Sequence, residues 1–330
     1  MIDRTDNKQR IEYIDTLRGL CMLSIVWYHT DHPGFLEYPF YNSALFFVSG
    51  MLYKPSSGGM FLKKKFFSFL IPFVFFYLIY YLFLLSLNFV KYHSVSNDIL
   101  FSIFDVFRLY KDTDGYVCNY PLWFLWALFW VQLVTQLMDR FIKNEYILLG
   151  IAFMISILGL HLQFVEHIPT PLMIGRSFTF LVYYISGYVI FGKFRNLQQV
   201  NKTWCIIVLL MLIFVLLRYC QPCHIVPSLF LIEYCVELII ISVILMLACK
   251  TICQNKMAKV LTWYGSNSLI IFGMHDMYLT SLRIFTINLL GEMNLLLGFI
   301  NWIVVLLLMI PTIILINRYL PFCVGKIKIL

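Results

Sequence analysis

The sequence predicts an all-α, polytopic membrane protein with about ten transmembrane helices, and three observations lead to this fold class. Apolar residues make up 61% of the 330-residue chain and charged residues only 13%, against about 45–50% and 25% in soluble domains. The mean hydropathy is +0.82, and apolar runs of about 20 residues recur along the chain. These values exclude a disordered chain, a disulfide-rich secreted domain and an ordinary soluble enzyme.

The apolar segments are expected to cross the membrane one after another, which places both termini on the same side. The second segment is short and has turn residues at its ends (Pro39 and Gly50), which favours a tilted or re-entrant helix. The predicted spans are 14–30, 38–53, 66–90, 122–139, 146–162, 173–192, 204–219, 226–249, 262–283 and 295–320.

We expect one transmembrane domain over residues 14–320, with a cytoplasmic segment, 1–13, before it and a cytoplasmic tail, 321–330, after it. The first span carries Asp15 and Arg18 and lacks a cleavage site of small residues, so it is expected to remain as a helix and not to be removed as a signal peptide. The longest connection, 91–121, is expected on the outer side, where loops of this length are usually functional.

The lysines and arginines are distributed unequally between the two sides. With a cytoplasmic N-terminus, 19 of the 25 lie inside, and the others are Lys91, Arg108, Lys111, Arg176, Arg218 and Arg283. This bias predicts that both termini are cytoplasmic. The net charge is +8, but the basic residues form short clusters between apolar runs, so we expect contact with membrane lipids and not with nucleic acid. The nine cysteines show no metal-binding spacing, and no metal is expected.

Two polar residues of the first span stand on one helix face. Arg18 and His29 are eleven positions apart, close to three helical turns, which separates them by about 16 Å along the axis. An arginine at the inner boundary can simply reach the lipid headgroups, and a histidine can belong to a polar helix end. Position alone therefore leaves a structural and a functional interpretation open for both residues.

The same segment carries a recognisable pattern: Arg10, Asp15, the stretch Leu17–Leu20 and the run Leu20–Tyr28 that leads to His29. It resembles the opening signature of the acyltransferase-3 family of integral membrane acyltransferases. Four further segments resemble family motifs in the family's order: FFVSGMLY (Phe46–Tyr53), a basic cluster before a proline (Lys63–Pro72), PLWFLWALF (Pro121–Phe129) and GSNSLIIFGMH (Gly265–His275).

The resemblance implies transfer of an acyl group, usually acetyl, from cytoplasmic acyl-CoA to a hydroxyl of a glycan or another acceptor. It implies that His29 is the essential histidine and Arg18 the arginine of the first helix, with acetyl-CoA as donor substrate and no bound cofactor. Relatives often carry arginines before the proline, whereas this chain has Lys64 and Lys65. Lysines would offer the CoA phosphates point charges in place of bidentate contacts. The most similar branch is associated with O-acetylation of sugars and surface polysaccharides.

The residues suit this chemistry. Ester formation from a thioester needs a base that is neutral near pH 7 to take the proton of the attacking hydroxyl, and histidine is the usual choice. We therefore predict His29 as the general base, with Arg18, Lys64 and Lys65 on the donor side. Direct transfer and an acyl-histidine intermediate both remain open.

A second group of polar residues is predicted near the outer side. Glu233 and Glu237 are four positions apart and share one face of the eighth span. Acids within a bilayer are rarely tolerated without partners. They either pair with Arg176, Arg218 or Arg283, or form an acceptor site that binds sugar hydroxyls.

His275 and Trp123 complete the predicted substrate-binding set of Glu233, Glu237 and Arg176. His275 stands beside Asp276 in the ninth span, either as a structural histidine or as a second functional one. Trp123 repeats at helical spacing with Trp126 and Trp130, which favours membrane anchoring or core packing but also permits sugar stacking.

We expect the plasma (inner) membrane as location, and as partners acyl-CoA, a glycan or lipid-linked sugar acceptor, membrane lipids and glycan-assembly proteins. Two other classes fit the same residues. A secondary transporter or flippase for a glycan or an anion would also use intramembrane acids and arginines. A noncatalytic subunit could scaffold a polysaccharide-assembly complex.

The predicted orientation can be tested by labelling single introduced cysteines with a membrane-impermeant reagent. Residues in 91–121 should react from outside, and residues in 54–65 and 193–203 should be protected, because the basic loops are expected inside. Labelling of the lysine-rich loops from outside would reverse the orientation and the donor route with it.

Overall fold

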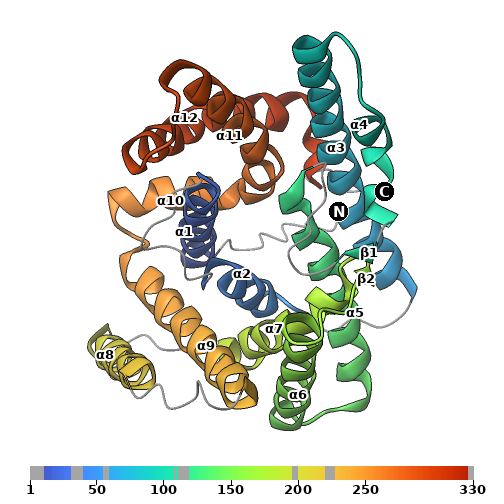
Figure 1. The fold of residues 1–330 in the computed structure, drawn as a ribbon. Coiled ribbons are helices and arrows are strands. Elements are labelled where there is room, and N and C mark those ends of the chain that lie inside the picture. The colour runs from blue at the N-terminus through green and yellow to red at the C-terminus, as the bar shows by residue number, and fades with distance from the viewer. Residues whose placement is uncertain are drawn as a thin grey trace, which may run out of the picture.

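The computed structural model describes residues 11–30, 40–54, 59–107, 109–110, 119–194, 200–219 and 227–325, and helices build nearly all of this part of the chain (Figure 1). The all-α prediction is confirmed. The helices are α1 Glu12–Tyr28, α2 Phe40–Met51, α3 Gly59–Tyr92, α4 Asn97–Phe101, α5 Trp123–Phe141, α6 Glu145–Phe164, α7 Ile174–Phe194, α8 Val200–Tyr219, α9 Pro227–Ile252, α10 Lys256–Ser266, α11 Ser268–Leu290 and α12 Leu295–Tyr319.

Each predicted span contains a helix, but the segment 262–283 is divided. α10 ends at Ser266 and α11 begins at Ser268, with Asn267 between them. The Asn267 amide donates to the carbonyl of Trp263 at 2.9 Å, and its oxygen accepts from the Asn317 side chain at 2.8 Å. An asparagine that bonds the backbone of the preceding turn competes with a continuous helix, and hydropathy does not record this effect.

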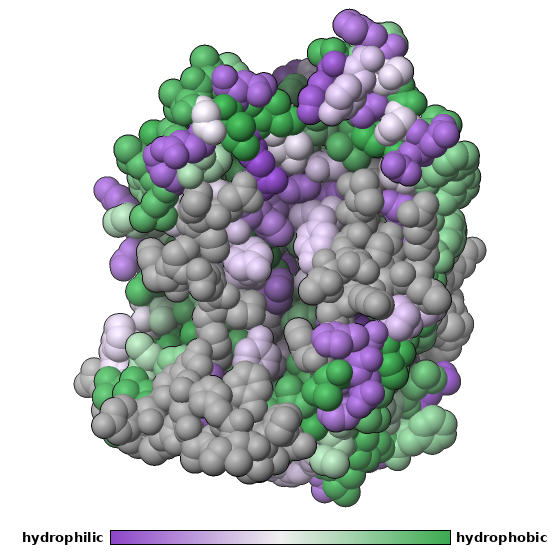
Figure 2. All heavy atoms as spheres, viewed as in Figure 1, coloured by the Kyte–Doolittle hydropathy of each residue, from purple (hydrophilic) through white to green (hydrophobic). Residues whose placement is uncertain are grey.

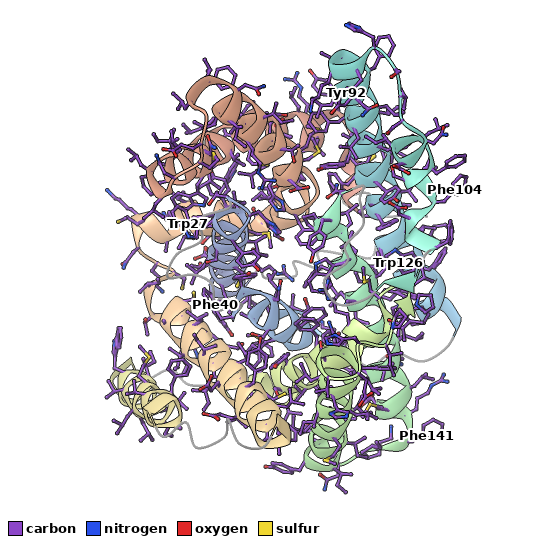
Figure 3. The ribbon with its side chains drawn as sticks, viewed as in Figure 1. Trp27, Phe40, Tyr92, Phe104, Trp126 and Phe141 are labelled. Atoms are coloured by element: carbon purple, nitrogen blue, oxygen red, sulfur yellow. The ribbon has the colours of Figure 1, made fainter. Side chains whose placement is uncertain are left out.

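Among the described residues, six helical segments are long and apolar enough to cross a membrane: Lys65–Tyr92, Tyr120–Phe141, Glu145–Gln163, Ile174–Phe191, Leu231–Ile252 and Leu295–Tyr319. α1 and α2 have only 17 and 12 residues, and the apolar part of α8 is the shorter segment Ile206–Val215. The outer surface agrees with lipid contact. Large apolar side chains such as Tyr92, Phe104 and Phe141 project outward (Figure 3), and Phe141 is 84% exposed.

α1 occupies the middle of the arrangement in Figure 1, where α2, α9, α10 and α11 pack against it. α2 also packs on α7, and α7 in turn on α5 and α6. α8 lies at the edge of the molecule beside α9. Residues at the C-terminal end of α1 are therefore enclosed by several helices.

Two pairs of helices meet backbone to backbone at glycines. A Cβ atom at Gly19 of α1 would overlap the carbonyl oxygen of Leu261 in α10, and one at Gly265 would overlap the carbonyl oxygen of Asp15. Gly50 of α2 and Gly187 of α7 face the carbonyl oxygens of Tyr184 and Phe47 in the same reciprocal way. Small residues at helix crossings are typical of membrane proteins, because close van der Waals contact replaces the hydrophobic driving force there.

Two outer connections are joined by a short antiparallel ladder. β1, Leu109–Tyr110, pairs with β2, Thr170–Pro171. β1 belongs to the long connection 91–121, and the structure also places α4 and a 3-10 helix, Ser102–Phe107, there. The connection is therefore fixed against the loop between α6 and α7.

Gly50→Ala is expected to lower the free energy of unfolding by about 1–3 kcal/mol, because the added methyl group meets backbone that cannot move aside. Gly150→Ala in α6 is the matched control, since a Cβ there has nothing within 4 Å. It should leave stability unchanged or raise it slightly through helix propensity. Thermal unfolding in detergent measures both, and equal melting temperatures would contradict the close crossing.

Candidate active site

The C-terminal end of α1 is held by two other helices. The His29 backbone N–H donates to Ile25 at 3.2 Å, and the His29 carbonyl accepts from Nη2 of Arg283 in α11 at 3.3 Å. Six residues before His29, Nε1 of Trp302 in α12 donates to the carbonyl of Leu23 at 3.0 Å. These hydrogen bonds fix the backbone that carries the half-buried His29 side chain.

His275 in α11 is fully buried, and its ring nitrogen Nδ1 is hydrogen-bonded to the backbone. Nδ1 lies 2.8 Å from the carbonyl oxygen of Ile271 and 3.1 Å from that of Phe272. Because carbonyl oxygens only accept, Nδ1 carries the proton and donates it, which leaves a lone pair on Nε2. Within the part of the chain that the structure describes, Nε2 of His275 has no hydrogen-bond partner.

The two histidines lie side by side, although 246 positions separate them in the sequence. Their ring centroids are 5.3 Å apart, with 47° between the ring planes. The His29 ring also has the Tyr120 ring at 6.3 Å. The charged side chains of Asp276 and Arg283 lie close enough to act electrostatically on His29. Hydrophilic residues gather in a recess near the middle of the face in Figure 2, where α1 and α11 approach each other in Figure 1.

Asn119 positions Tyr120 next to this pair. Its backbone has a left-handed φ of 58°, which asparagine tolerates better than most residues. Its buried amide nitrogen donates to the carbonyl of Gly273 at 2.9 Å and to that of Phe76 at 3.4 Å. Asn119 was not among the predicted site residues; its signal in the sequence is an asparagine directly before Tyr120–Pro121, at a helix start.

A family model described as an acyltransferase domain matches residues 11–318. The chain belongs to the acyltransferase-3 family. With this family and its long apolar helices, the protein is a multi-pass membrane acyltransferase. The comparison with curated proteins finds no match, and the comparison with solved structures finds none either.

In this acyltransferase, Arg18 lies in the first half of α1, about three turns before His29. Its Nη1 is 3.5 Å from the Asp15 carboxylate, and its side chain is 28% exposed while that of Asp15 is buried. Lys65 is half-buried near the start of α3, and the side chain of Lys64 lies outside the described residues. Arg18 and His29 are thus held by one helix, about 16 Å apart along its axis.

The other predicted residues lie on further elements. Glu237 of α9 is 2% exposed and Glu233 is half-buried. Tyr234, beside Glu233, acts electrostatically on Tyr41, whose ring lies 5.5 Å from Tyr28. α9 therefore brings this part of its chain towards the aromatic surroundings of His29.

Arg176 and Trp123 form a contact that the sequence did not predict. The Arg176 guanidinium lies over the Trp123 ring, 4.5 Å from its centroid, and Trp123 stacks on Phe180 on α7 at 5.6 Å. The side chain of Arg218 lies outside the described residues. Among the described residues, no cluster of three or more His, Cys, Asp or Glu is arranged to bind a metal.

Proposed function

We propose that this acyltransferase moves an acetyl group from cytoplasmic acetyl-CoA to a hydroxyl of a surface glycan or lipid-linked glycan precursor, in the plasma (inner) membrane. The observation that carries the proposal is the contact between His29 and His275 at the end of α1. His29 is partly exposed and His275 is fully buried, so an acceptor reaches His29 first. Glycan-assembly proteins are the partners that would supply the acceptor.

His29 acts as the general base. Its imidazole takes the proton of the acceptor hydroxyl while the hydroxyl oxygen attacks the thioester carbonyl carbon. The carbon–sulfur bond then breaks, CoA leaves as a thiolate, and the imidazolium returns the proton to the sulfur. The products are the acetyl ester and free CoA, so atoms and protons balance without a further reactant.

His275 is proposed as the residue that orients His29. Two imidazoles joined by an N–H···N bond of about 2.9 Å have ring centroids about 5 Å apart, close to the 5.3 Å between these rings. The lone pair on Nε2 of His275 can accept the N–H of one His29 nitrogen, which presents the other nitrogen to the acceptor. A base oriented by a third group is the arrangement found in catalytic triads.

Acetyl-CoA is proposed to bind on the cytoplasmic side, with Arg18, Lys64 and Lys65 near its phosphates and its pantetheine arm directed along α1 towards His29. Arg18 can make the planar contacts that phosphates favour. Glu233, Glu237, Arg176, His275 and Trp123 are proposed on the acceptor side. The half-burial of Glu233 and the burial of Glu237 support a role inside the helix bundle.

His29→Ala should abolish acetyl transfer while abundance stays near that of wild type, since losing a general base typically costs a factor of about 10² to 10⁴. Transfer of labelled acetyl groups from acetyl-CoA to glycan in membrane vesicles measures the effect. His161→Ala is the control, because His161 is an exposed histidine on α6 that pairs with Glu166 at 3.5 Å. Normal transfer by a well-folded His29→Ala variant would exclude this mechanism.

Arg18→Lys should raise the KM for acetyl-CoA and leave kcat nearly unchanged, because lysine keeps the charge but loses the bidentate contact. Arg18→Gln would also leave the buried Asp15 without this partner, so stability could fall for a separate reason. The double change Asp15→Asn with Arg18→Gln removes both charges. A double variant with normal stability and a normal KM would show that the arginine serves only the pair with Asp15.

A further inference from the structure

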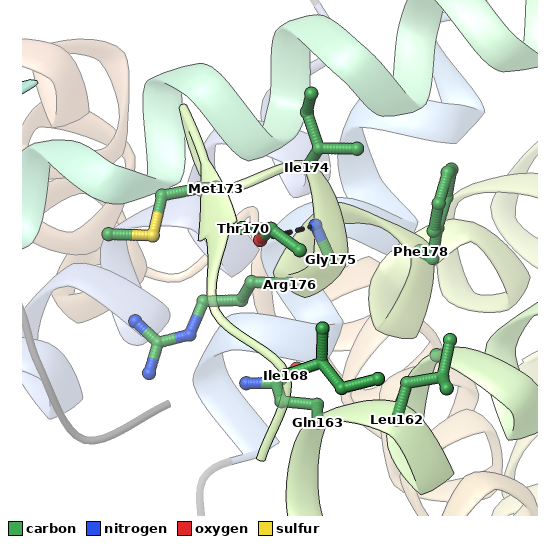
Figure 4. Close-up of a pocket in the computed structure, with 10 residues that line it drawn as sticks. Leu162, Gln163, Ile168, Thr170, Met173, Ile174, Gly175, Arg176 and Phe178 are labelled. Atoms are coloured by element: carbon green, nitrogen blue, oxygen red, sulfur yellow. Dashed lines mark hydrogen bonds between the residues drawn. The ribbon is translucent and has the colours of Figure 1, made fainter. Parts of the chain in front are cut away.

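A pocket opens between the end of α6 and the start of α7, apart from the histidine pair. Its cavity measures about 90 Å³, several times the roughly 10–15 Å³ that one water molecule requires, so it has room for a small polar group. Apolar side chains such as Leu162, Ile174 and Phe178 form most of its wall. Gln163 and Arg176 lie together on the side away from Phe178 (Figure 4).

The loop that closes the pocket is fixed from several directions. Thr170 Oγ1 accepts from the backbone N–H of Gly175 at 3.0 Å, and Trp130 Nε1 donates to the carbonyl of Leu172 at 3.0 Å. β2 pairs with β1 at its outer edge. Leu172 and Met173 are held at left-handed φ angles of 50° and 59°, where residues with a Cβ are strained. The pocket is therefore built in advance and does not depend on closure around a ligand.

Two polar groups give this pocket its chemical character. Gln163 is 6% exposed, and within the described part of the chain its Oε1 accepts no hydrogen bond. Such a buried acceptor calls for a donor. The Arg176 guanidinium lies over the Trp123 ring, 4.5 Å from its centroid, and brings to the pocket a positive charge of the kind that binds carboxylates and phosphates. The start of α7 adds the positive end of a helix dipole.

We propose that this pocket binds an acidic sugar unit of the acceptor, with its carboxylate on Arg176 and a neighbouring hydroxyl donating to Gln163 Oε1. This inference rests on the proposed function and names the acceptor class. A lipid phosphodiester group carries no hydrogen-bond donor of its own, so a lipid could satisfy Gln163 only through another part of its headgroup, and the experiment below includes lipid as a separate outcome. A hydroxylated carboxylic acid satisfies both groups at once.

The pocket and the histidine pair share one short segment of chain. Trp123, under Arg176, begins α5, and Tyr120, beside His29, begins the 3-10 turn Tyr120–Leu122 directly before it. A glycan with its acidic unit in the pocket can therefore extend along residues 120–123 towards His29. The pocket selects the acceptor, and the histidines carry out the transfer.

Binding is tested with the purified full chain in phosphatidylcholine nanodiscs, by equilibrium dialysis of radiolabelled D-glucuronate with D-glucose as the neutral comparison. Wild type should bind glucuronate about tenfold or more tightly than glucose, because a charge-assisted contact is lost with glucose. Gln163→Met should weaken glucuronate binding by about threefold to tenfold, and Arg176→Gln by more. Gln132→Met is the matched control, since Gln132 is an equally buried glutamine on α5 outside the pocket.

Equal affinity of wild type and a folded Gln163→Met variant for glucuronate would overturn the inference. If phosphatidylglycerol in the nanodiscs occupies the pocket and glucuronate does not bind, the inference is overturned as well, and the site is assigned to lipid. Acetyl transfer from acetyl-CoA to glycan is measured for the same protein in membrane vesicles. Transfer without glucuronate binding removes only the acidic-sugar inference, whereas glucuronate binding without any transfer to glycan removes the proposed function and leaves the pocket as a binding site.

Discussion

The backbone contact of α1 with α10, at Gly19 and Gly265, is the constraint on which the centre of the molecule depends. In lipid, helices gain little from burying apolar surface against one another, so close contact must supply the cohesion. A rigid α1 carries the geometry of this crossing to its far end, where Arg283 holds the His29 carbonyl. The position of the His29 ring is thus set by a helix contact about three turns earlier in α1 and by one hydrogen bond at the end of the helix.

The sequence predicts those features that depend on local composition. Apolar runs locate the helices, and the pattern around Arg18 and His29 locates the first helix of the family. The division at Asn267 depends on side-chain bonds to Trp263 and Asn317, which hydropathy does not register. The sequence singled out Arg176 and Trp123 separately, but their stacking depends on how α5 and α7 pack. Asn119 was missed because its partners, Gly273 and Phe76, come from distant helices.

The candidate residues fall into two groups along α1. Arg18 and Asp15 pair in its first half, while His29 lies at its C-terminal end with His275 and Tyr120 beside it. In the proposed reaction, a phosphate-bearing donor and a hydroxyl-bearing acceptor would meet different surroundings at these two places. Only the extended arm of the donor would then have to cross the roughly three helical turns between Arg18 and His29.

The bonds from Nδ1 of His275 to the carbonyls of Ile271 and Phe272 limit how many protons the histidine pair can store. Nδ1 already carries a proton, which it donates to these carbonyl oxygens. Any proton exchange at His275 therefore takes place at Nε2. In the proposed mechanism, a proton accepted from one hydroxyl group would charge a pair that lies close to Arg283, and a second positive charge there would be opposed. The proposal therefore implies that CoA leaves with this proton before the next acceptor reacts, which would link the release of CoA to the readiness of the site.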